Sequence, residues 1–278
     1  MAARILACLA VTSALQAPVQ PVRQATQLQA LGVFEGLGAV VIGGGVAALL
    51  AEDNRDIDDK TEVEKYFNGE DGFGRWNKIY SETDDINGVQ KEIRDGHGQT
   101  IDKVLGWAEA DGRTVCDLGC GVGSLAIPLA QKGATVSASD ISAAMATEAS
   151  KRAAAAGVTT ATFDTSDMEN VSGEYDTVSC IDVMIHYPTD KMVNLVDKLC
   201  ALSMDKIYVS FAPKTPQLAV LKKVGSLFPG PSKATRAYLH KEEDVVAALA
   251  KNGFTVNRSH LTSQNFYFSL LLEATAKA

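Results

Sequence analysis

Residues 115–123 read Val-Cys-Asp-Leu-Gly-Cys-Gly-Val-Gly, and this stretch predicts how the chain folds. A short apolar run carries an acid near its end, and three alternating glycines then lead into a helix-like segment at 124–131. A strand, a glycine loop and a helix in this order are typical of the first unit of a Rossmann-type sheet. Glycine has no Cβ atom, so a ligand can approach the backbone of this loop closely. We therefore expect an α/β domain that binds a small molecule here.

Strand-like and helix-like segments alternate through the rest of the chain. Strands are expected at 114–118, 135–140, 160–164, 175–181, 206–211, 254–261 and 266–274. Helices are expected at 124–131, 142–156, 189–202 and 241–252. The alternation favours a parallel sheet, whereas the short connection between the last two strands predicts an antiparallel hairpin. Upstream, helices at 61–68 and 86–108 predict an N-terminal arm (61–112), with Thr61 and Glu64 as a capping box.

An acidic side chain lies at or just after the end of each of the first four strands: Asp117, Asp140, Asp167 and Asp182. In a parallel sheet these ends meet at one edge. Asp140 follows the first glycine by about twenty residues, which suits two hydrogen bonds to ribose hydroxyls. Asp117 suits the cationic amino group of an amino-acid ligand, and the loop amides are expected around the carboxylate of that ligand. This order of acids indicates S-adenosylmethionine as the cofactor.

Neighbouring residues complete the predicted cofactor site. Asp167 is expected to accept a hydrogen bond from the adenine amino group, with Met168 and Ile141 against the ring; the alternative is that Asp167 only caps a turn. Asp182 is expected beside the methyl donor. The full predicted set is Asp117, Gly119, Cys120, Gly121, Gly123, Asp140, Ile141, Ser142, Asp167, Met168 and Asp182.

The predicted fold is α/β, a Rossmann-like class I methyltransferase domain at 113–278. It has a mostly parallel seven-stranded sheet with a closing antiparallel hairpin, the N-terminal helical arm and a lid insertion at 213–240. A nicotinamide-dependent dehydrogenase is the alternative, although its third glycine usually lies elsewhere. A second glycine motif at 43–48 matches a dinucleotide fingerprint, but it runs into a charged linker instead of a βαβ unit, and we interpret it as coincidental.

Composition and the first sixty residues bear on partners and location. A net charge of −8 over 278 residues argues against nucleic acid as a partner, and the five cysteines show no zinc-like pairing. Residues 1–30 combine an apolar run with acid-free sequence, like the bipartite leaders of proteins in complex plastids. This predicts a plastid protein, stromal or membrane-associated, with secretion as the alternative. Residues 31–60 form a hydrophobic segment and a charged linker, which suits a sorting signal, a membrane anchor or a packed helix.

Several long motifs beyond the glycine loop are specific enough to indicate a family. Residues 72–80 read Gly-Phe-Gly-Arg-Trp-Asn-Lys-Ile-Tyr, and residues 93–100 read Ile-Arg-Asp-Gly-His-Gly-Gln-Thr. The most discriminating block, 228–240, reads Phe-Pro-Gly-Pro-Ser-Lys-Ala-Thr-Arg-Ala-Tyr-Leu-His. On these motifs the chain resembles the magnesium-protoporphyrin IX methyltransferases of chlorophyll biosynthesis, from about residue 66 to residue 273.

The resemblance implies transfer of a methyl group from S-adenosylmethionine to a propionate of magnesium-protoporphyrin IX. It implies that magnesium belongs to the substrate, so we expect no metal bound by the protein. Tyr80 and His186 match positions implicated in activity, and we expect them to position and desolvate the propionate. The alternatives are a core tyrosine and a histidine that caps the next helix. A magnesium chelatase subunit and the thylakoid or envelope membrane surface are the expected partners.

The insertion at 213–240 is too long for a simple connection. Its apolar stripe suits a cover over a flat porphyrin and consists of Leu218, Leu221, Val224, Leu227 and Phe228. Lys214, Lys233 and Arg236 are expected to bind the second propionate, and a lid that only packs on the core is the alternative. Two other functions fit the sequence less well: methylation of a small metabolite or lipid headgroup, and non-catalytic binding of a cofactor or porphyrin.

Overall fold

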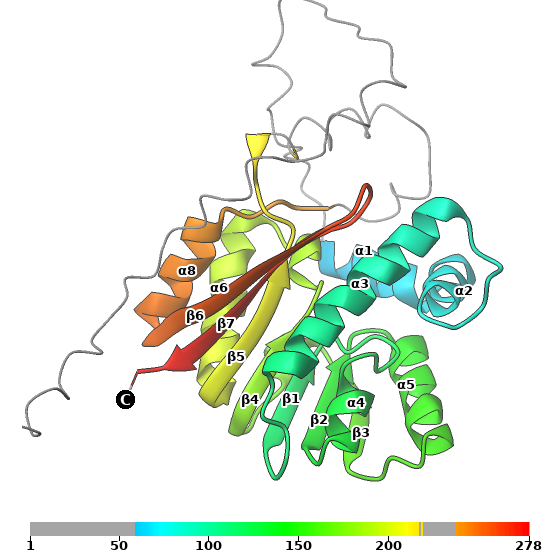
Figure 1. Cartoon of the computed structure of the whole chain (residues 1–278), viewed down its shortest axis with the longest axis horizontal. Coiled ribbons are helices and arrows are strands. Elements are labelled where there is room, and N and C mark those ends of the chain that lie inside the picture. The colour runs from blue at the N-terminus through cyan, green and yellow to red at the C-terminus, as the bar shows by residue number, and fades with distance from the viewer. Residues whose placement is uncertain (1–58, 217, 219–236, 278) are drawn as a thin grey trace, which may run out of the picture. The chain divides into compact units, whose positions relative to one another are not determined.

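The computed structural model describes residues 59–216, 218 and 237–277 (Figure 1). The strands are β1 Thr114–Leu118, β2 Thr135–Asp140, β3 Ala161–Thr165, β4 Tyr175–Cys180, β5 Ser203–Phe211, β6 Phe254–Ser263 and β7 Phe268–Ala276. The α-helices are α1 Asp59–Asn68, α2 Glu70–Ile79, α3 Gly88–Trp107, α4 Ala126–Gln131, α5 Ala143–Ala155, α6 Thr189–Leu202 and α8 Glu242–Lys251. Two single-turn 3₁₀ helices are η3 Met168–Asn170 and η4 Met184–His186.

The strands form one sheet in the order β3-β2-β1-β4-β5-β7-β6 (Figure 1). β1 to β5 pair in parallel, and β7 is antiparallel to both β5 and β6. The chain first builds outward from β1 to β3 and then crosses to β4 on the other side of β1. Ligands of open α/β sheets bind at such a reversal, outside the carboxyl ends of the strands. The predicted fold class is confirmed, and each expected strand is present: β1 and β2 have the expected bounds, and the ends of the other strands differ by at most three residues.

Both faces of the sheet are buried, because successive side chains of a strand point to opposite faces. On β7, Leu270 and Leu272 pack in a cluster that includes residues of α6 and α8. Leu271 packs in a second cluster with residues of α3 and α4. The middle strands are therefore held from both sides, which places the loops at their carboxyl ends on a rigid support.

The three helices α1, α2 and α3 precede β1 (Figure 1). α1 and α3 occupy the two segments expected to be helical, but α2 is not expected because Gly72 and Gly74 lower the helix propensity of its sequence. The capping box expected at Thr61 is wrong, since α1 already includes Asp59 and Thr61 lies inside the helix. A capping box does form at the start of α3, between Asn87 and Gln90.

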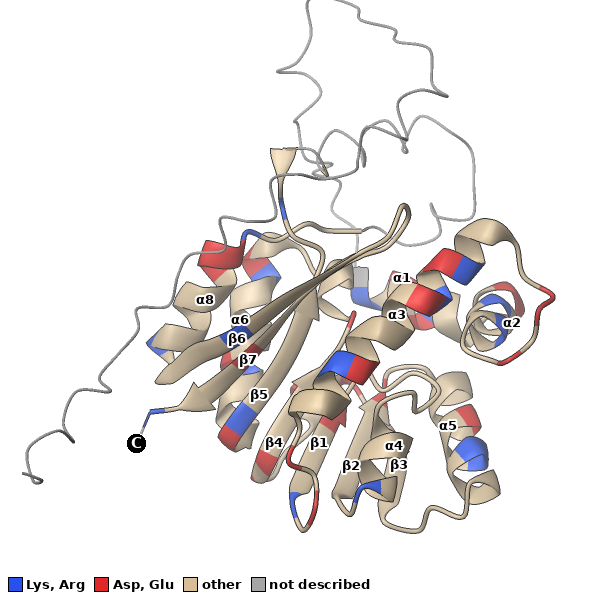
Figure 2. Cartoon of the chain, viewed as in Figure 1, with Lys and Arg blue, Asp and Glu red and all other residues tan. Residues whose placement is uncertain are grey.

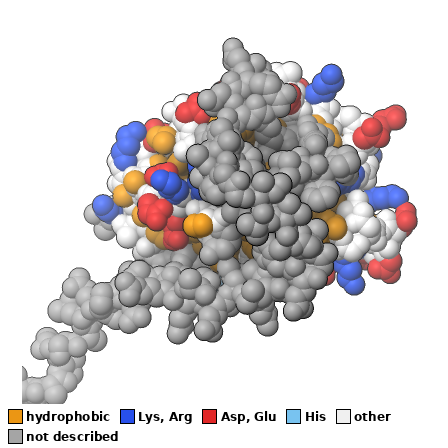
Figure 3. All heavy atoms as spheres, turned by 90° about the horizontal axis from the view of Figure 1, so that it is seen from above, with side chains coloured by type: hydrophobic (Ala, Val, Ile, Leu, Met, Phe, Trp, Pro, Cys, Tyr) orange, Lys and Arg blue, Asp and Glu red, His pale blue; other side chains and the backbone are white. Residues whose placement is uncertain are grey.

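Acidic and basic residues both occur along helices such as α3 and α5 (Figure 2). In the view from above, hydrophobic side chains are visible between acidic and basic ones (Figure 3). Among the described helices, none combines the length and the hydropathy of a membrane span.

Several predictions fall on residues that the structure does not describe. They are the leader 1–30, the hydrophobic segment and linker up to residue 58, most of the insertion 213–240 including Leu221, Val224, Leu227 and Phe228, and the basic residues Lys233 and Arg236.

Candidate functional site

A cavity of about 460 Å³ lies at the carboxyl ends of β1 to β4, and this volume is in the range of small-molecule sites. The predicted site residues that line it are Tyr80, Gly119, Cys120, Gly121, Asp140, Ile141, Asp167, Met168, Asp182 and His186. The predicted residues Asp117, Gly123, Ser142 and Lys214 do not line it. The structure therefore brings most of the predicted cofactor residues together with the two predicted catalytic residues.

The glycine loop adopts the backbone conformation that its sequence requires. Gly119, Gly121 and Gly123 have φ angles of 72°, 54° and 85°, a region in which other residues are strained. The backbone N–H groups of Gly119 and Cys120 both donate to the carbonyl oxygen of Ser139, at 2.8 and 3.0 Å. These two hydrogen bonds hold the loop against the end of β2.

Asp140 is the last residue of β2 and lines the cavity. Its Oδ2 accepts a hydrogen bond from the Gly121 N–H at 2.9 Å, and its Oδ1 accepts one from the Ser142 N–H at 2.8 Å. Burial raises the pKa of this carboxyl, and the two backbone hydrogen bonds act in the opposite direction. Two N–H groups thus orient the carboxylate, while its other lone pairs stay available to a ligand in the cavity.

Ser142 connects two helices near the cavity. It is the N-cap of α5, where its side chain accepts a hydrogen bond from the Met145 N–H. Its hydroxyl also lies 3.0 Å from the Phe67 carbonyl oxygen and 3.0 Å from Asn68 Oδ1. Ser142 therefore joins the end of α1 to the start of α5, and its expected contact with the cofactor stays a prediction.

Asp117 lies beneath the loop, with 3% of its surface exposed. Ser179 Oγ donates a hydrogen bond to its Oδ1 at 2.6 Å. Burial raises the pKa of Asp117 to about 6, although the hydrogen bond from Ser179 lowers it. A carboxylate in this position can act on a cationic ligand across the loop, but the protein without ligand bears the cost of burying it.

We expect Asp117→Asn to raise the melting temperature of the ligand-free protein at pH 7 by several degrees. The folded-state pKa of about 6 exceeds the value near 3.9 of an unfolded aspartate. The stabilising contribution of the protonated Asp117 carboxyl is therefore full below pH 4 and is lost as the pH rises through 6, where the buried charge destabilises the fold and asparagine does not. The rise of the Asp117 pKa to about 6 corresponds to a cost of about 3 kcal/mol at pH 7. Thermal unfolding between pH 4 and pH 8 measures this, and a variant that gains as much at pH 4 as at pH 7 would contradict it.

Asp167 caps a turn and also lies at the cavity, and its expected hydrogen bond to an adenine amino group stays a prediction. Its side chain caps η3 by accepting a hydrogen bond from the Glu169 N–H at 3.1 Å, and it also lines the cavity. The Lys60 ammonium group of α1 forms an ion pair with it. Sequence reasoning missed Lys60, because nothing in the sequence indicates that α1 lies across the loop after β3.

Tyr80 follows α2 directly and lies on the arm side of the cavity. Two guanidinium groups hold this end of α2. Arg152 of α5 donates to the Tyr80 carbonyl oxygen at 2.6 Å and to Asn77 Oδ1 at 2.6 Å, and Arg94 of α3 donates to the Ile79 carbonyl oxygen at 2.7 Å. Cations that satisfy the last carbonyls of a helix stabilise its end. The position of Tyr80 is therefore determined by two other helices.

His186 lies on η4, the turn that follows β4. Its ring meets Phe67 of α1 edge to face, with ring centroids 5.5 Å apart. The described end of the insertion bonds to this turn: the Tyr238 N–H donates to the Ile185 carbonyl oxygen at 2.7 Å, and His240 Nε2 lies 2.9 Å from the Met184 carbonyl oxygen. The conspicuous block at 228–240 thus ends by supporting the turn that carries His186.

Lys214 is exposed and lies outside the cavity lining, and its backbone N–H donates to the His240 carbonyl oxygen at 2.6 Å. Its expected contact with a second propionate stays a prediction, as do those of Lys233 and Arg236. Among the described residues, no group of three His, Cys, Asp or Glu side chains is placed to hold a metal ion.

Comparison with known proteins decides the family. The model described as magnesium-protoporphyrin IX methyltransferase C-terminus matches residues 180–276, and a methyltransferase-domain model matches residues 115–203. The magnesium-protoporphyrin O-methyltransferase of Synechocystis sp. is 52% identical over 80% of this chain and 98% of its own length. The chain belongs to the magnesium-protoporphyrin IX methyltransferase family.

Other members of this family agree in sequence and in fold. The chloroplastic magnesium protoporphyrin IX methyltransferase of Arabidopsis thaliana is 48% identical over 85% of this chain and 82% of its own length. The crystal structure of the Synechocystis family member with bound SAH has a TM-score of 0.73 at 48% identity, covering 78% of this chain and all of that chain. The family predicted from the motifs is thus confirmed.

Proposed function

We propose that this chain transfers the methyl group of S-adenosylmethionine to a propionate carboxylate of magnesium-protoporphyrin IX, giving the monomethyl ester. The observation that carries the proposal is family membership: relatives named for this activity are 52% and 48% identical over most of both chains. Structures of the Synechocystis family member with bound SAH and with bound SAM support the identity of the methyl donor.

The residues around the cavity fit this cofactor. Asp167 and Met168 after β3, Asp140 at the end of β2 and the loop at 119–121 follow one another along the sheet edge. An adenine ring, a ribose and an amino-acid chain occur in the same order in S-adenosylmethionine. The Asp140 carboxylate is already oriented by two N–H groups, which suits a pair of ribose hydroxyls.

The reaction asks little acid–base chemistry of the protein. Bound S-adenosylmethionine supplies a methyl group on a positively charged sulfur. A propionate has a pKa near that of glutamate, about 4.3, so it is ionised at pH 7 and needs no strong base. The tasks left to this chain are to hold the carboxylate in line with the methyl group and to keep water out.

Tyr80 and His186 are placed for these tasks, since both line the cavity, Tyr80 after α2 and His186 on the turn after β4. Burial raises the pKa of Tyr80, with Asp182 and Asp140 adding to the shift, so its hydroxyl stays protonated. A protonated hydroxyl can donate a hydrogen bond to the propionate, which orients that carboxylate without competing for the methyl group. We assign the same orienting task to the His186 ring.

We expect His186→Ala and Tyr80→Phe each to lower kcat by about tenfold to a hundredfold, because positioning contributes on this scale. Cofactor affinity should stay within about twofold, since neither residue belongs to the predicted cofactor set. Steady-state kinetics with the porphyrin and calorimetric titration with S-adenosylhomocysteine measure the two effects. Tyr175→Phe is a matched control, because the Tyr175 hydroxyl bonds to Ser172 and lies outside the cavity lining. Full turnover in either variant would remove that residue from the mechanism.

The activity itself is tested by incubating the purified protein with methyl-labelled S-adenosylmethionine and magnesium-protoporphyrin IX. The expected product is labelled porphyrin monomethyl ester, separated by chromatography. A protein that binds the cofactor in a titration and forms no ester would exclude the proposed function. Labelling of another acceptor in a cell extract would then point to a different methyltransferase.

We also propose that residues 1–30 direct the chain to a plastid. The signal-like, acid-poor sequence supports this, as does the Arabidopsis relative, which is named as chloroplastic. Fusion of residues 1–60 to a fluorescent protein in an alga with complex plastids tests it, and secretion of the fusion would contradict it. Attachment to the thylakoid or envelope membrane and docking of a magnesium chelatase subunit stay predictions.

A further inference from the structure

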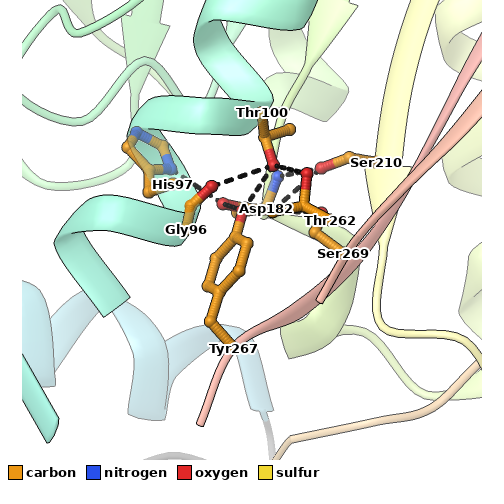
Figure 4. Close-up of polar contacts among 8 residues, drawn as sticks. All are labelled: Gly96, His97, Thr100, Asp182, Ser210, Thr262, Tyr267 and Ser269. Carbon is orange, nitrogen blue, oxygen red and sulfur yellow. Dashed lines mark hydrogen bonds and ion pairs between the residues drawn. The ribbon is translucent and has the colours of Figure 1, made fainter. Parts of the chain in front are cut away.

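A buried polar cluster joins the arm to the far end of the sheet (Figure 4). Its members are Gly96, His97 and Thr100 of α3, Asp182 after β4, Ser210 of β5, and Thr262, Tyr267 and Ser269 of the β6–β7 hairpin. We call it the Asp182 cluster. It contains three residues of the motif at 93–100, and none of the three has a part in the proposed reaction described above.

Asp182 is the centre of this cluster, and donors surround its carboxylate. Oδ1 accepts hydrogen bonds from the hydroxyls of Ser210 at 2.9 Å and Ser269 at 2.8 Å. Oδ2 accepts one from the Tyr267 hydroxyl at 2.6 Å and lies 2.8 Å from His97 Nδ1. Although burial opposes ionisation, the hydrogen bonds and the charge of His97 lower the pKa of Asp182. Four donors occupy an ionised carboxylate, which leaves it little capacity to bind a ligand itself.

The backbone around the cluster is adapted to these contacts. Asp182 has a φ angle of 60°, and among the described residues it is the one non-glycine with positive φ. A strained conformation of this kind persists where the surroundings hold it, and it is common at functional sites. A Cβ atom on Gly96 would lie 2.3 Å from Tyr267 Cδ1, so only glycine lets the tyrosine ring approach α3. The motif is therefore shaped to receive the hairpin and to place His97 against Asp182.

The bond to Asp182 determines how the His97 ring can serve a ligand. An ionised carboxylate accepts, so Nδ1 must carry the proton that it donates. The ring lines the cavity beside Tyr80, with the two ring centroids 4.6 Å apart. Within the described residues Nε2 forms no hydrogen bond, and it is the polar atom of the ring left for a bound molecule.

His97 also lies at a defined end of the cavity. Along the sheet edge the order is β3, β2, β1 and β4, so Asp167 and Asp182 mark opposite ends of the row of loops. With the adenine at Asp167 and the ribose at Asp140, the amino-acid part of the cofactor reaches toward the β1 and β4 loops. The methyl group and its acceptor lie in the same direction. Both of the molecules that meet there carry a carboxylate.

We propose that His97, positioned by Asp182, binds a carboxylate through Nε2–H at the methyl-transfer end of the cavity. A ring protonated on both nitrogens donates Nδ1–H to Asp182 and Nε2–H to the ligand. The carboxylate belongs either to the methionine part of the cofactor or to the acceptor propionate. This inference rests on the proposed function for the identity of these two ligands.

Two substitutions separate ligand binding from the support of the cluster. Asparagine places an amide group near the position of Nδ1, so His97→Asn keeps a donor for Asp182 and loses the atom that faces the cavity. Glutamine places its amide near Nε2, so His97→Gln does the reverse. Loss of a hydrogen bond to a charged group weakens binding about tenfold or more. We expect that loss of binding in His97→Asn, with a nearly unchanged melting temperature. In His97→Gln we expect a lower melting temperature, with binding tighter than in His97→Asn.

The measurements are the Kd for S-adenosylhomocysteine, the KM for the porphyrin, kcat and the melting temperature, each compared with the unmodified full chain. A raised Kd in His97→Asn assigns the methionine carboxylate, and an unchanged Kd with a raised KM assigns the propionate. If His97→Asn kept the Kd and the KM of the unmodified chain and only His97→Gln raised them, His97 would be purely structural and the inference would be overturned. The unmodified chain tests the proposed function in the same assay. Failure of the proposed function would appear in the unmodified chain, whereas failure of the inference about His97 would appear only in the variants.

Discussion

Asp140→Ala is expected to raise the Kd for S-adenosylmethionine by at least about a hundredfold. Two hydrogen bonds from ribose hydroxyls to a charged carboxylate contribute roughly 1.5–3 kcal/mol each, and 1.4 kcal/mol corresponds to a factor of ten. The substitution also removes the acceptor for the N–H groups of Gly121 and Ser142, so the glycine loop loses its bond to β2 through this side chain. Calorimetric titration with S-adenosylhomocysteine measures the loss.

Asp164→Ala is the matched control for this experiment. Asp164 pairs in register with Ser139 on the neighbouring strand, but it is exposed and does not line the cavity. Its removal should leave the Kd within about twofold of the unmodified protein. Equal affinities in both variants would show that the ribose binds elsewhere and that the predicted role of Asp140 is wrong.

Asp182→Asn is expected to lower the melting temperature by roughly 10 °C at pH 7. The change removes a buried charge and turns an amide toward donors, and breaking a buried charged network costs about 3–5 kcal/mol. Because the folded state lowers the pKa of Asp182, its contribution is present above the unfolded value near 3.9 and is lost as the pH falls below it. The difference between variant and parent should therefore shrink below about pH 4.

Asp85→Asn provides the comparison. Asp85 also has a lowered pKa, owing to the hydrogen bond from Lys78, but its side chain is 81% exposed. Exposed ion pairs contribute little to stability, so its melting temperature should match that of the parent. A similar small effect from both substitutions would mean that the Asp182 cluster is not a stabilising unit.

The cofactor side of the site could be predicted from the sequence because it depends on local order. Asp140, Asp167 and the glycine loop stand at strand ends, and the alternation of strands and helices is enough to bring strand ends to one edge. The order of acids along the chain therefore becomes an order in space. For the same reason, the parallel sheet and its closing hairpin could be predicted before any contact was known.

The arm side could not be predicted to the same depth, because its contacts join residues far apart in the chain. His97 meets Asp182 across 85 positions, and Arg152 meets the Tyr80 carbonyl across 72. No periodicity in the sequence indicates such pairs. The helix α2 was missed for a different reason: its two glycines disfavour a helix locally, and bonds from Arg94 and Arg152 to its last turn compensate.

Helix α5 contacts both the predicted cofactor site and the predicted acceptor site. Its N-cap residue Ser142 donates its backbone N–H to Asp140, and Arg152 in its last turn donates to the Tyr80 carbonyl oxygen. Ten residues of helix separate these two points, a rise of about 15 Å. The residue expected to hold the ribose and the residue expected to orient the acceptor therefore both form hydrogen bonds with one helix, which itself contributes no reacting atom.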